Sequence, residues 1–256
     1  MRKEEEPTTL AIDVGGTGVK AALLDAKGRM ASERLRVPTP NPCRPDVLLG
    51  TIDALAKQLT SFDRVSVGFP GVVRAGRIVT APHFGTEDWR GEDFAAALTR
   101  RLGKPVRILN DAEVQGLGIV KRTGLEVVLT LGTGLGSAIF SDGGLAPHIE
   151  LAHIPVTRRK TYNDYIGDSS LKSIGKKRWN RRVLRVIAIV ETLLNYDLLY
   201  LGGGNSRHVE PNLPANVRIS GNDAGLTGGI HLWDDAIWNA VPTGQGRREP
   251  RRAAAS

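Results

Sequence analysis

Apolar and polar positions follow the same order in two parts of the chain. Residues 10–29 and 126–145 each show an apolar strand, a glycine-rich turn, a second apolar strand and another turn. Apolar runs bounded by glycine and polar clusters are typical of β-hairpins. Segments with helical spacing follow each copy, which starts about 120 residues from the other. The repeat predicts two α/β halves with a boundary near residues 111–118 and a cleft between them.

The remaining elements follow from the spacing of apolar residues. Between residues 45 and 60, Val47, Leu48, Ile52 and Leu55 recur as on one face of a helix. Predicted helices cover 45–60, 91–102, 169–197 and 222–238, and further predicted strands cover 64–71, 105–111 and 198–205. We expect an N-terminal α/β domain over 8–112, a C-terminal α/β domain over 113–235 and a basic, disordered tail over 236–256.

Composition excludes several classes of protein. The 256 residues are 41% apolar and 24% charged, which excludes a fully disordered chain and a coiled coil. The single cysteine, Cys43, excludes an internal disulfide framework and a Cys-based zinc site, and fits a reducing compartment. We see neither a signal-peptide pattern nor an apolar stretch of about 18 residues. We therefore expect a cytoplasmic protein that has no membrane partner.

The glycine-rich turns are the first candidate ligand sites. Without a Cβ in the way, their backbone N–H groups can surround a phosphate. The Walker A pattern is absent, and a dinucleotide fingerprint would need a helix after the turn, where the sequence predicts a strand. Two such turns facing each other would hold a phosphoryl donor from both sides, and the alternative is two hairpins without a ligand. The candidates are Asp13, Gly15, Gly16, Thr17, Gly18, Lys20, Gly132, Thr133, Gly134 and Gly136, with a third cluster at Gly202, Gly203 and Gly204.

Polar residues at a strand end supply the candidate chemistry. Asn110 and Asp111 end an apolar strand, where α/β folds place ligands. Asp111 could take the proton of a hydroxyl that attacks phosphorus, and the alternative is an Asn-Asp helix cap. Glu150 and His153 would share a face on a helical turn and bind adjacent hydroxyls of a polyol. Gly71, in a Pro-Gly turn, leaves room for a sugar ring or forms a simple turn.

Six motifs, taken in order, resemble the ROK (repressor, ORF, kinase) family of sugar kinases. They are IDVGGTGVK, GFPGVV, LNDAEVQGLG, LTLGTGLGSAIF, ELAH and LGGGN, and the resemblance spans roughly residues 8–232. Finer details resemble the polyphosphate glucokinase branch, namely TPNP, VGFPGVVRAG, KTYNDYIG and NDAGLTGG. The resemblance implies an α/β, two-domain, actin-like ATPase (ribonuclease H-like) fold with a cleft between the domains. It also implies a homodimer.

The resemblance also implies roles for the candidate residues. Asp111 matches the base that activates the sugar 6-hydroxyl, and Asn110, Glu150 and His153 match ligands of the sugar hydroxyls. Asp13 and the turns at 15–18 and 132–136 match the surroundings of the transferred phosphate and Mg²⁺. Residues 202–204 match the nucleotide-side loop. Mg²⁺ would arrive with the donor, near Asp13, without a protein cluster of metal ligands.

Three departures separate the chain from the family pattern. Many members carry a Cys-rich zinc motif after the glutamate-histidine stretch, and this chain has none, as is usual in the polyphosphate branch. Ala152 stands where the family has glycine, and its methyl group would tilt His153. Asn163 stands where we expect an acid, next to Asp164. These changes bear on turnover rather than on fold.

The net charge of +8 bears on the phosphoryl donor. Residues 158–185 hold ten Lys or Arg and two Asp, and their balance equals that of the whole chain. Cations at a helix start oppose the helix dipole, which suggests that an anion docks nearby. Either a polyphosphate track or a solvated helix face would explain them. The candidate track comprises Lys176, Lys177, Arg178, Arg181 and Arg182.

These observations favour a glucokinase that uses inorganic polyphosphate, with ATP as a further donor and glucose or a similar hexose as acceptor. An ATP-dependent ROK hexokinase and a sugar-sensing ROK protein without turnover are the alternatives. A DNA-binding repressor would need a helix-turn-helix before the first strand, where this sequence has about seven residues. Aromatic residues are 5% of the chain, which disfavours base stacking, so we expect no nucleic-acid partner.

Overall fold

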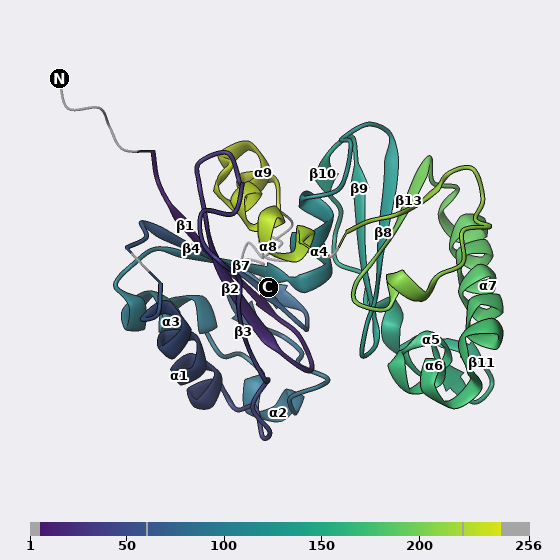
Figure 1. Ribbon diagram of the computed structural model, residues 1–256, viewed down its shortest axis with the longest axis horizontal. Helices are drawn as coiled ribbons and strands as arrows, with labels where there is room; N and C mark the ends of the chain where they lie inside the picture. Colours follow the sequence, from purple (N-terminus) through teal and green to yellow (C-terminus); the bar gives the residue numbers. More distant parts are fainter. Residues whose placement is uncertain (1–5, 60, 222, 242–256) are drawn as a thin grey trace, which may run out of the picture.

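The computed structural model describes residues 6–59, 61–221 and 223–241. Two five-stranded sheets stand side by side, and the buried helix α4 (Asp111–Leu117) lies between them (Figure 1). The helix follows directly from a strand of the first sheet and contacts strands of both sheets. Its position places the predicted catalytic segment at the junction of the two halves.

The first sheet has the strand order β3-β2-β1-β4-β7. Its strands are β1 (Thr9–Val14), β2 (Val19–Leu24), β3 (Leu35–Val37), β4 (Arg64–Phe69) and β7 (Val106–Asn110). β1 pairs antiparallel with β2 and parallel with β4. Both faces of β1 are buried, because Leu10 and Ile12 pack in the core with Leu48 while Ala11 packs with Leu226 on the other face. This explains the unbroken apolar run in its sequence.

Helices of the first half cover one face of this sheet. Pro45 starts the first of them, and Asp93 caps another by accepting a hydrogen bond from the Ala96 backbone N–H. Trp89 packs on Phe69 with ring centroids 4.9 Å apart and closes the core. The elements are α1 (Pro45–Ala56), α2 (Thr86–Trp89), α3 (Phe94–Leu102) and the short strands β5 (Val73–Arg74) and β6 (Arg77–Ile78).

The second sheet repeats the pattern with the order β10-β9-β8-β13-β14. Its strands are β8 (Leu125–Leu131), β9 (Leu135–Ser141), β10 (Gly144–Leu145), β13 (Leu198–Gly202) and β14 (Val217–Ile219). β8 pairs antiparallel with β9 and parallel with β13. Trp179 and Val183 pack in one core with Val127 and Leu129 of the sheet. The covering elements are η1 (Leu151–His153), β11 (Pro155–Thr157), β12 (Lys160–Thr161), α5 (Tyr162–Ile166), α6 (Asp168–Ile174), α7 (Lys176–Leu194) and η2 (Ser206–His208).

The single helix predicted over 169–197 is wrong. Two helices, α6 and α7, occupy this range and meet at Gly175. Gly175 has φ of +76°, a left-handed conformation that interrupts an α-helix and that glycine adopts without strain. The basic residues therefore stand at the true start of α7, where no side chain caps the helix.

The helix predicted over 222–238 is also interrupted; residue 222 lies outside the described residues. α8 (Ala224–Thr227), the 3₁₀ helix η3 (Gly228–Trp233) and α9 (Asp235–Ala240) take its place. Gly228 packs so closely on the Val114 carbonyl oxygen that a side chain would overlap it. The disordered tail predicted over 236–256 is wrong at its start, because α9 covers Asp235–Ala240. The Asp234 carboxylate caps this helix by accepting hydrogen bonds from backbone N–H groups at its start. The rest of that tail, 242–256, lies outside the described residues.

The end of the described chain returns to the first half (Figure 1). Ser66 Oγ of β4 donates to the Gly229 carbonyl at 2.6 Å, and Trp233 Nε1 donates to Ser66 Oγ at 2.8 Å. Arg107 lies over the Trp233 ring, 4.6 Å from its centroid. Residues 224–233 thus fall inside the predicted second domain but pack on the first sheet. Within the described part of the chain, no helix has the length and apolar character needed to span a membrane.

Candidate active site

A cleft of about 720 Å³ lies between the two halves, with walls from both sheets. It brings together most of the candidates that the sequence singled out. Those in its lining are Asp13, Gly15, Gly16, Thr17, Gly18, Lys20, Gly71, Asn110, Asp111, Gly132, Thr133, Gly134, Gly136, Glu150, His153, Gly203 and Gly204. Gly202 and the five basic residues of the candidate track lie outside this lining.

The two glycine turns face each other across the cleft. The Gly15 backbone N–H donates to the Gly18 carbonyl at 3.0 Å and closes the first turn. A Cβ added to Gly16 would lie 3.2 Å from Thr133 Oγ1 of the second turn, which shows how closely the two turns approach each other. Asp13 pairs with Lys20 across the first hairpin at 2.8 Å. The repeated pattern in the sequence therefore forms the two walls of one site.

The third glycine cluster supports the second turn from behind. Asn205 Nδ2 donates to the Gly132 carbonyl at 3.1 Å. Gly203 has φ of +80°, and a side chain there would overlap the Leu131 backbone. Gly202 leaves room for the Gln115 amide, which itself lines the cleft. Gly202 thus acts behind the cleft wall, while Gly203 and Gly204 belong to it.

Asp111 is the first residue of α4 and lies at the end of β7, within the cleft. Burial raises the pKa of its carboxyl to about 7, and the nearby charges of Asp13, Glu150 and Glu113 contribute in the same direction. Its carboxylate accepts a hydrogen bond from the Ala112 backbone N–H, which opposes the rise in pKa. A carboxyl with a pKa near neutrality is suited to accept a proton from a substrate.

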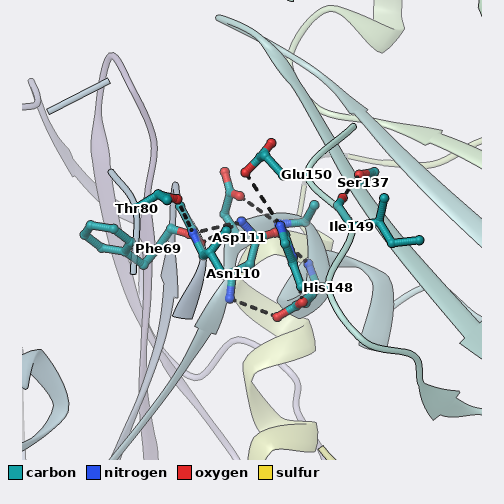
Figure 2. A network of polar contacts seen from close by, with 12 residues as sticks. Phe69, Thr80, Asn110, Asp111, Ser137, His148, Ile149 and Glu150 are labelled. Carbon is teal, nitrogen blue, oxygen red and sulfur yellow. Dashed lines mark hydrogen bonds and ion pairs between the residues drawn. The ribbon is translucent and has the colours of Figure 1, made fainter. Parts of the chain in front are cut away.

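Asn110 holds the backbone around Asp111. Its Oδ1 accepts from the Ala112 N–H at 2.9 Å and caps α4. Its Nδ2 donates to the carbonyl oxygens of Gly71 at 3.1 Å and Phe69 at 3.4 Å (Figure 2). In this structure the amide therefore fixes the Gly71 turn instead of pointing freely at a ligand. Gly71 is required there, since a side chain would overlap the Thr80 carbonyl.

Glu150 enters the cleft just before η1 and meets a histidine that the motifs did not indicate. His148 Nδ1 lies 2.8 Å from Glu113 Oε1, and His148 Nε2 lies 3.6 Å from Glu150 Oε2 (Figure 2). Although burial alone would lower it, the two carboxylates raise the pKa of His148 to about 9. Burial likewise opposes the change at Glu150, where His148 lowers the pKa of the carboxyl. Glu150 therefore stays ionised at neutral pH.

Some of these residues could have been found in the sequence. Glu113 is three residues after Asn110, the spacing of a capping box, and its Oε2 accepts from the Asn110 N–H at 3.1 Å. His148 carried no such signal, because its partner Glu113 is 35 residues away. His83 also lines the cleft, and burial together with the charge of His153 lowers the pKa of its imidazole.

The cations of the cleft differ from the predicted track. Arg34, Arg36, Lys172 and Arg207 line the cleft together with Lys20. Arg182 is committed elsewhere: it donates to Ser170 Oγ at 2.8 Å and lies over the Tyr165 ring. The other four residues of the candidate track are exposed on α7, outside the cleft lining. They are Lys176, Lys177, Arg178 and Arg181.

The residues that depart from the family pattern have structural roles here. Asn163 Oδ1 accepts from the Leu135 N–H at 2.7 Å and so holds the end of the second glycine turn. Asp164 caps α5 through Thr161. Ala152 lies in η1, between Glu150 and His153 in the sequence, and its side chain is buried. Among residues 6–59, 61–221 and 223–241, no group of three His, Cys, Asp or Glu forms a metal site.

Two sheets of one repeated order, with glycine turns and carboxylates between them, define the two-domain actin-like ATPase fold that the sequence predicted. Residues 9–160 match the model of the ROK family, which is more than half of the chain. This chain belongs to the ROK family.

One curated relative and two solved structures show what this chain is similar to. The polyphosphate glucokinase of Mycobacterium tuberculosis (strain ATCC 25177 / H37Ra) is 31% identical over 241 residues, 85% of this chain and 88% of the relative. The inorganic polyphosphate/ATP-glucomannokinase of Arthrobacter sp. strain KM is 31% identical with a TM-score of 0.80, covering 88% of this chain and 97% of that one. The ROK family glucokinase of Streptomyces griseus, solved with glucose and AMPPNP, is 20% identical with a TM-score of 0.75, covering 88% and 98%, and shares the fold.

Proposed function

We propose that this protein is a sugar kinase, and specifically a glucokinase that transfers a phosphoryl group from inorganic polyphosphate, and also from ATP, to the 6-hydroxyl of glucose. The observation that carries the proposal is the position of Asp111. Its carboxyl, with a pKa raised to about 7, lies in one cleft with Glu150 and His153 and with the facing glycine turns. A base, hydroxyl ligands and a phosphate cradle are the parts that phosphoryl transfer to a sugar needs.

The chain's own residues supply positioning, proton transfer and charge. Glu150 accepts hydrogen bonds from sugar hydroxyls, and His153 contacts a neighbouring hydroxyl from the other end of η1. Asp111 takes the proton of the attacking hydroxyl, which then forms the new P–O bond while the donor's bridging P–O bond breaks. Backbone N–H groups at 15–18 and 132–136 stabilise charge on the transferred group.

In this proposal Mg²⁺ would bind together with the donor and would supply charge neutralisation at the phosphate oxygens. The site fits such an ion, because the Asp13 carboxylate lies in the cleft beside the first turn and keeps one oxygen outside its pair with Lys20. Donor phosphates and water would complete the oxygen ligands that Mg²⁺ prefers.

The cleft cations support polyphosphate as donor. Five cations line the cleft, namely Lys20, Arg34, Arg36, Lys172 and Arg207. Three of them pair with carboxylates in the structure: Lys20 with Asp13, Arg34 with Asp223 and Lys172 with Asp168. A group of cations in one cleft suits a flexible polyanion that extends beyond the transferred group. An ATP-dependent hexokinase is the second candidate, because the third glycine loop at Gly203 and Gly204 leaves bare backbone beside the cleft. The homodimer and the cytoplasmic location implied by the sequence remain predictions.

The test is sugar phosphate formation by the purified protein with Mg²⁺ and long-chain polyphosphate, ATP or GTP, each with glucose and mannose. We expect glucose 6-phosphate to form fastest with polyphosphate. Faster turnover with ATP would assign the chain to ATP-dependent hexokinases. Absence of sugar phosphate with all three donors would overturn the proposal.

A further inference from the structure

Two carboxylates and one imidazole form an ionic chain across the cleft wall. Glu113 belongs to the first turn of α4, and Glu150 belongs to the segment that leads from the second sheet into η1. His148 lies between them, with 10% of its side chain exposed. Glu113 is buried and Glu150 is partly exposed to the cleft. Figure 2 shows the contact between His148 and Glu150.

The hydrogen bonds of His148 indicate that Glu150 is the second partner of its imidazole. Nδ1 bonds Glu113 at 2.8 Å, but Nε2 is buried and has no hydrogen-bond partner among the described residues. An unpaired buried donor is costly, so a partner is expected. Glu150 Oε2, at 3.6 Å, is slightly beyond hydrogen-bond distance. A shift of a few tenths of an ångström on sugar binding would close that gap.

Hydrogen bonds to the backbone fix both ends of this ionic chain, at Glu113 and next to Glu150. Glu113 Oε2 accepts from the Asn110 backbone N–H at 3.1 Å, directly beside Asp111. On the other side, Ser137 Oγ of β9 donates to the Ile149 carbonyl at 2.7 Å and fixes the backbone before Glu150. A series of polar contacts thus runs from the Asn110 backbone, next to Asp111, to the Glu150 carboxylate.

We propose that His148 is a positioning residue: as an imidazolium it ties Glu113 to Glu150, and so holds Glu150 ionised and at a fixed place relative to Asp111. The inference rests on the proposed sugar kinase activity, in which Glu150 binds the sugar and Asp111 takes its proton. His148 itself touches neither reactant. It acts through the two carboxylates on either side of it.

The proposal also implies an effect of His148 on Asp111. Glu113 and Glu150 both raise the pKa of Asp111, and we expect a cation between these carboxylates to offset part of that repulsion. The titratable groups that face His148 are Glu113 from α4 and Glu150 from the segment before η1. His153 also acts on Glu150 through its charge. Loss of the imidazolium should therefore make Asp111 harder to ionise.

The first measurement is independent of turnover. NMR titration of the imidazole resonances, assigned with His148→Gln, should give a pKa for His148 close to 9 in the free protein. A value below 7 would overturn the ionic chain. If the pKa of His148 is close to 9 and no donor phosphorylates any sugar, the proposed function fails while the ionic chain remains.

The second measurement is steady-state kinetics of His148→Gln. The KM for sugar should rise about tenfold, as for loss of one charge-assisted hydrogen bond, while the KM for the donor stays within twofold. The acid limb of the kcat profile should move to higher pH by roughly half a unit. The matched control is His231→Gln, because His231 contacts Arg122 outside the cleft lining. This control should change neither the two KM values nor the acid limb. Equal changes in both KM values with an unmoved acid limb would reduce His148 to a structural residue.

A double variant tests the sign of the charge effect. Glu113→Gln keeps an oxygen for the Asn110 N–H, as capping boxes allow, but removes one negative charge near Asp111. Its acid limb should move to lower pH, and the limb of the double variant Glu113→Gln/His148→Gln should return close to wild type. A double variant whose limb matches that of His148→Gln alone would contradict the proposal.

Discussion

Replacement of Asp111 by Asn removes one ionisable group from the cleft and keeps the size of the side chain. Asp111 Oδ1 accepts from the Ala112 N–H at 2.9 Å, and an amide oxygen can accept the same hydrogen bond. The cap of α4 depends on Asn110, which is unchanged. The variant should therefore fold as the wild type does, and differences in rate can be assigned to chemistry.

The expected loss of rate follows from the lost base. With a pKa of about 7, roughly half of the wild-type Asp111 side chains are ionised at pH 7 and nearly all at pH 8. The wild-type kcat should therefore rise through an acid limb near pH 7. Removing a general base typically costs about 10²–10⁴ in rate, so Asp111→Asn should lose at least a hundredfold in kcat at pH 8.

The same pKa predicts that Asp111→Asn is more stable than the wild type at pH 8. The unfolded carboxyl loses its proton near its ordinary pKa of 3.8, whereas the folded one keeps it up to about pH 7. The contribution of Asp111 to the free energy of unfolding of the wild type thus falls as pH rises from 3.8 to 7 and stays lowered above that range. At 1.36 kcal/mol per pH unit the cost reaches up to about 4 kcal/mol. Asp111→Asn avoids it and should be more stable at pH 8, with the difference vanishing below pH 4.

The assay pairs kcat for glucose phosphorylation with the midpoint of thermal unfolding, both measured at pH 8. The account predicts a large loss of kcat together with a Tm higher by up to about 8–16 °C, at about 2–4 °C per kcal/mol for a chain of this size. A kcat within threefold of wild type would refute Asp111 as the base. A lower Tm would refute the argument that its burial is what raises the pKa.

Three further predictions concern the walls of the cleft. Glu150→Gln should raise the KM for sugar far more than the KM for the donor, because an amide accepts weaker hydrogen bonds than a carboxylate; sugar titration at saturating donor checks it, and an unchanged KM contradicts it. Arg36→Gln combined with Arg207→Gln should lower kcat/KM for long polyphosphate more than for ATP and flatten the salt dependence by roughly 0.7–0.9 per lost contact; equal losses for both donors would refute the cleft as the polyphosphate path. Gly71→Ala should lower the free energy of unfolding by about 1–3 kcal/mol in urea titrations, since its methyl would overlap a backbone oxygen, whereas Gly50→Ala, with open space in α1, should not destabilise.

The sequence alone predicted the repeated halves because their signal is local. Apolar alternation, glycine turns and helical spacing each depend on neighbours within a few residues, and β1–β2 and β8–β9 form as expected. The break at Gly175 was missed, because an isolated glycine within an otherwise helical pattern does not reveal a left-handed φ. The interruption at Gly228 was missed because its cause, the close approach to Val114 of α4, is a tertiary contact.

The same limit applies to the site. The sequence indicated Asp111 through a strand end, the glycine turns through hairpin patterns and Glu150 through its spacing to His153, and the structure places all of them in one cleft. His148 was missed since its charge depends on Glu113 and Glu150 meeting it in space. The basic run on α7 was predicted as a polyphosphate track from its charge density and from its position at a helix start, and its residues lie outside the cleft lining. The cations that line the cleft, among them Arg36 and Arg207, are scattered along the chain and become a group only in the folded structure.

The central claim is that Asp111 and the glycine turns transfer a phosphoryl group to a sugar hydroxyl. Its most direct test is ³¹P NMR of a reaction that contains the purified protein, Mg²⁺, long-chain polyphosphate and glucose. The account predicts a phosphomonoester resonance of glucose 6-phosphate that grows with time and is absent with Asp111→Asn. Release of inorganic phosphate without a sugar phosphomonoester, or equal product from the variant, would contradict it.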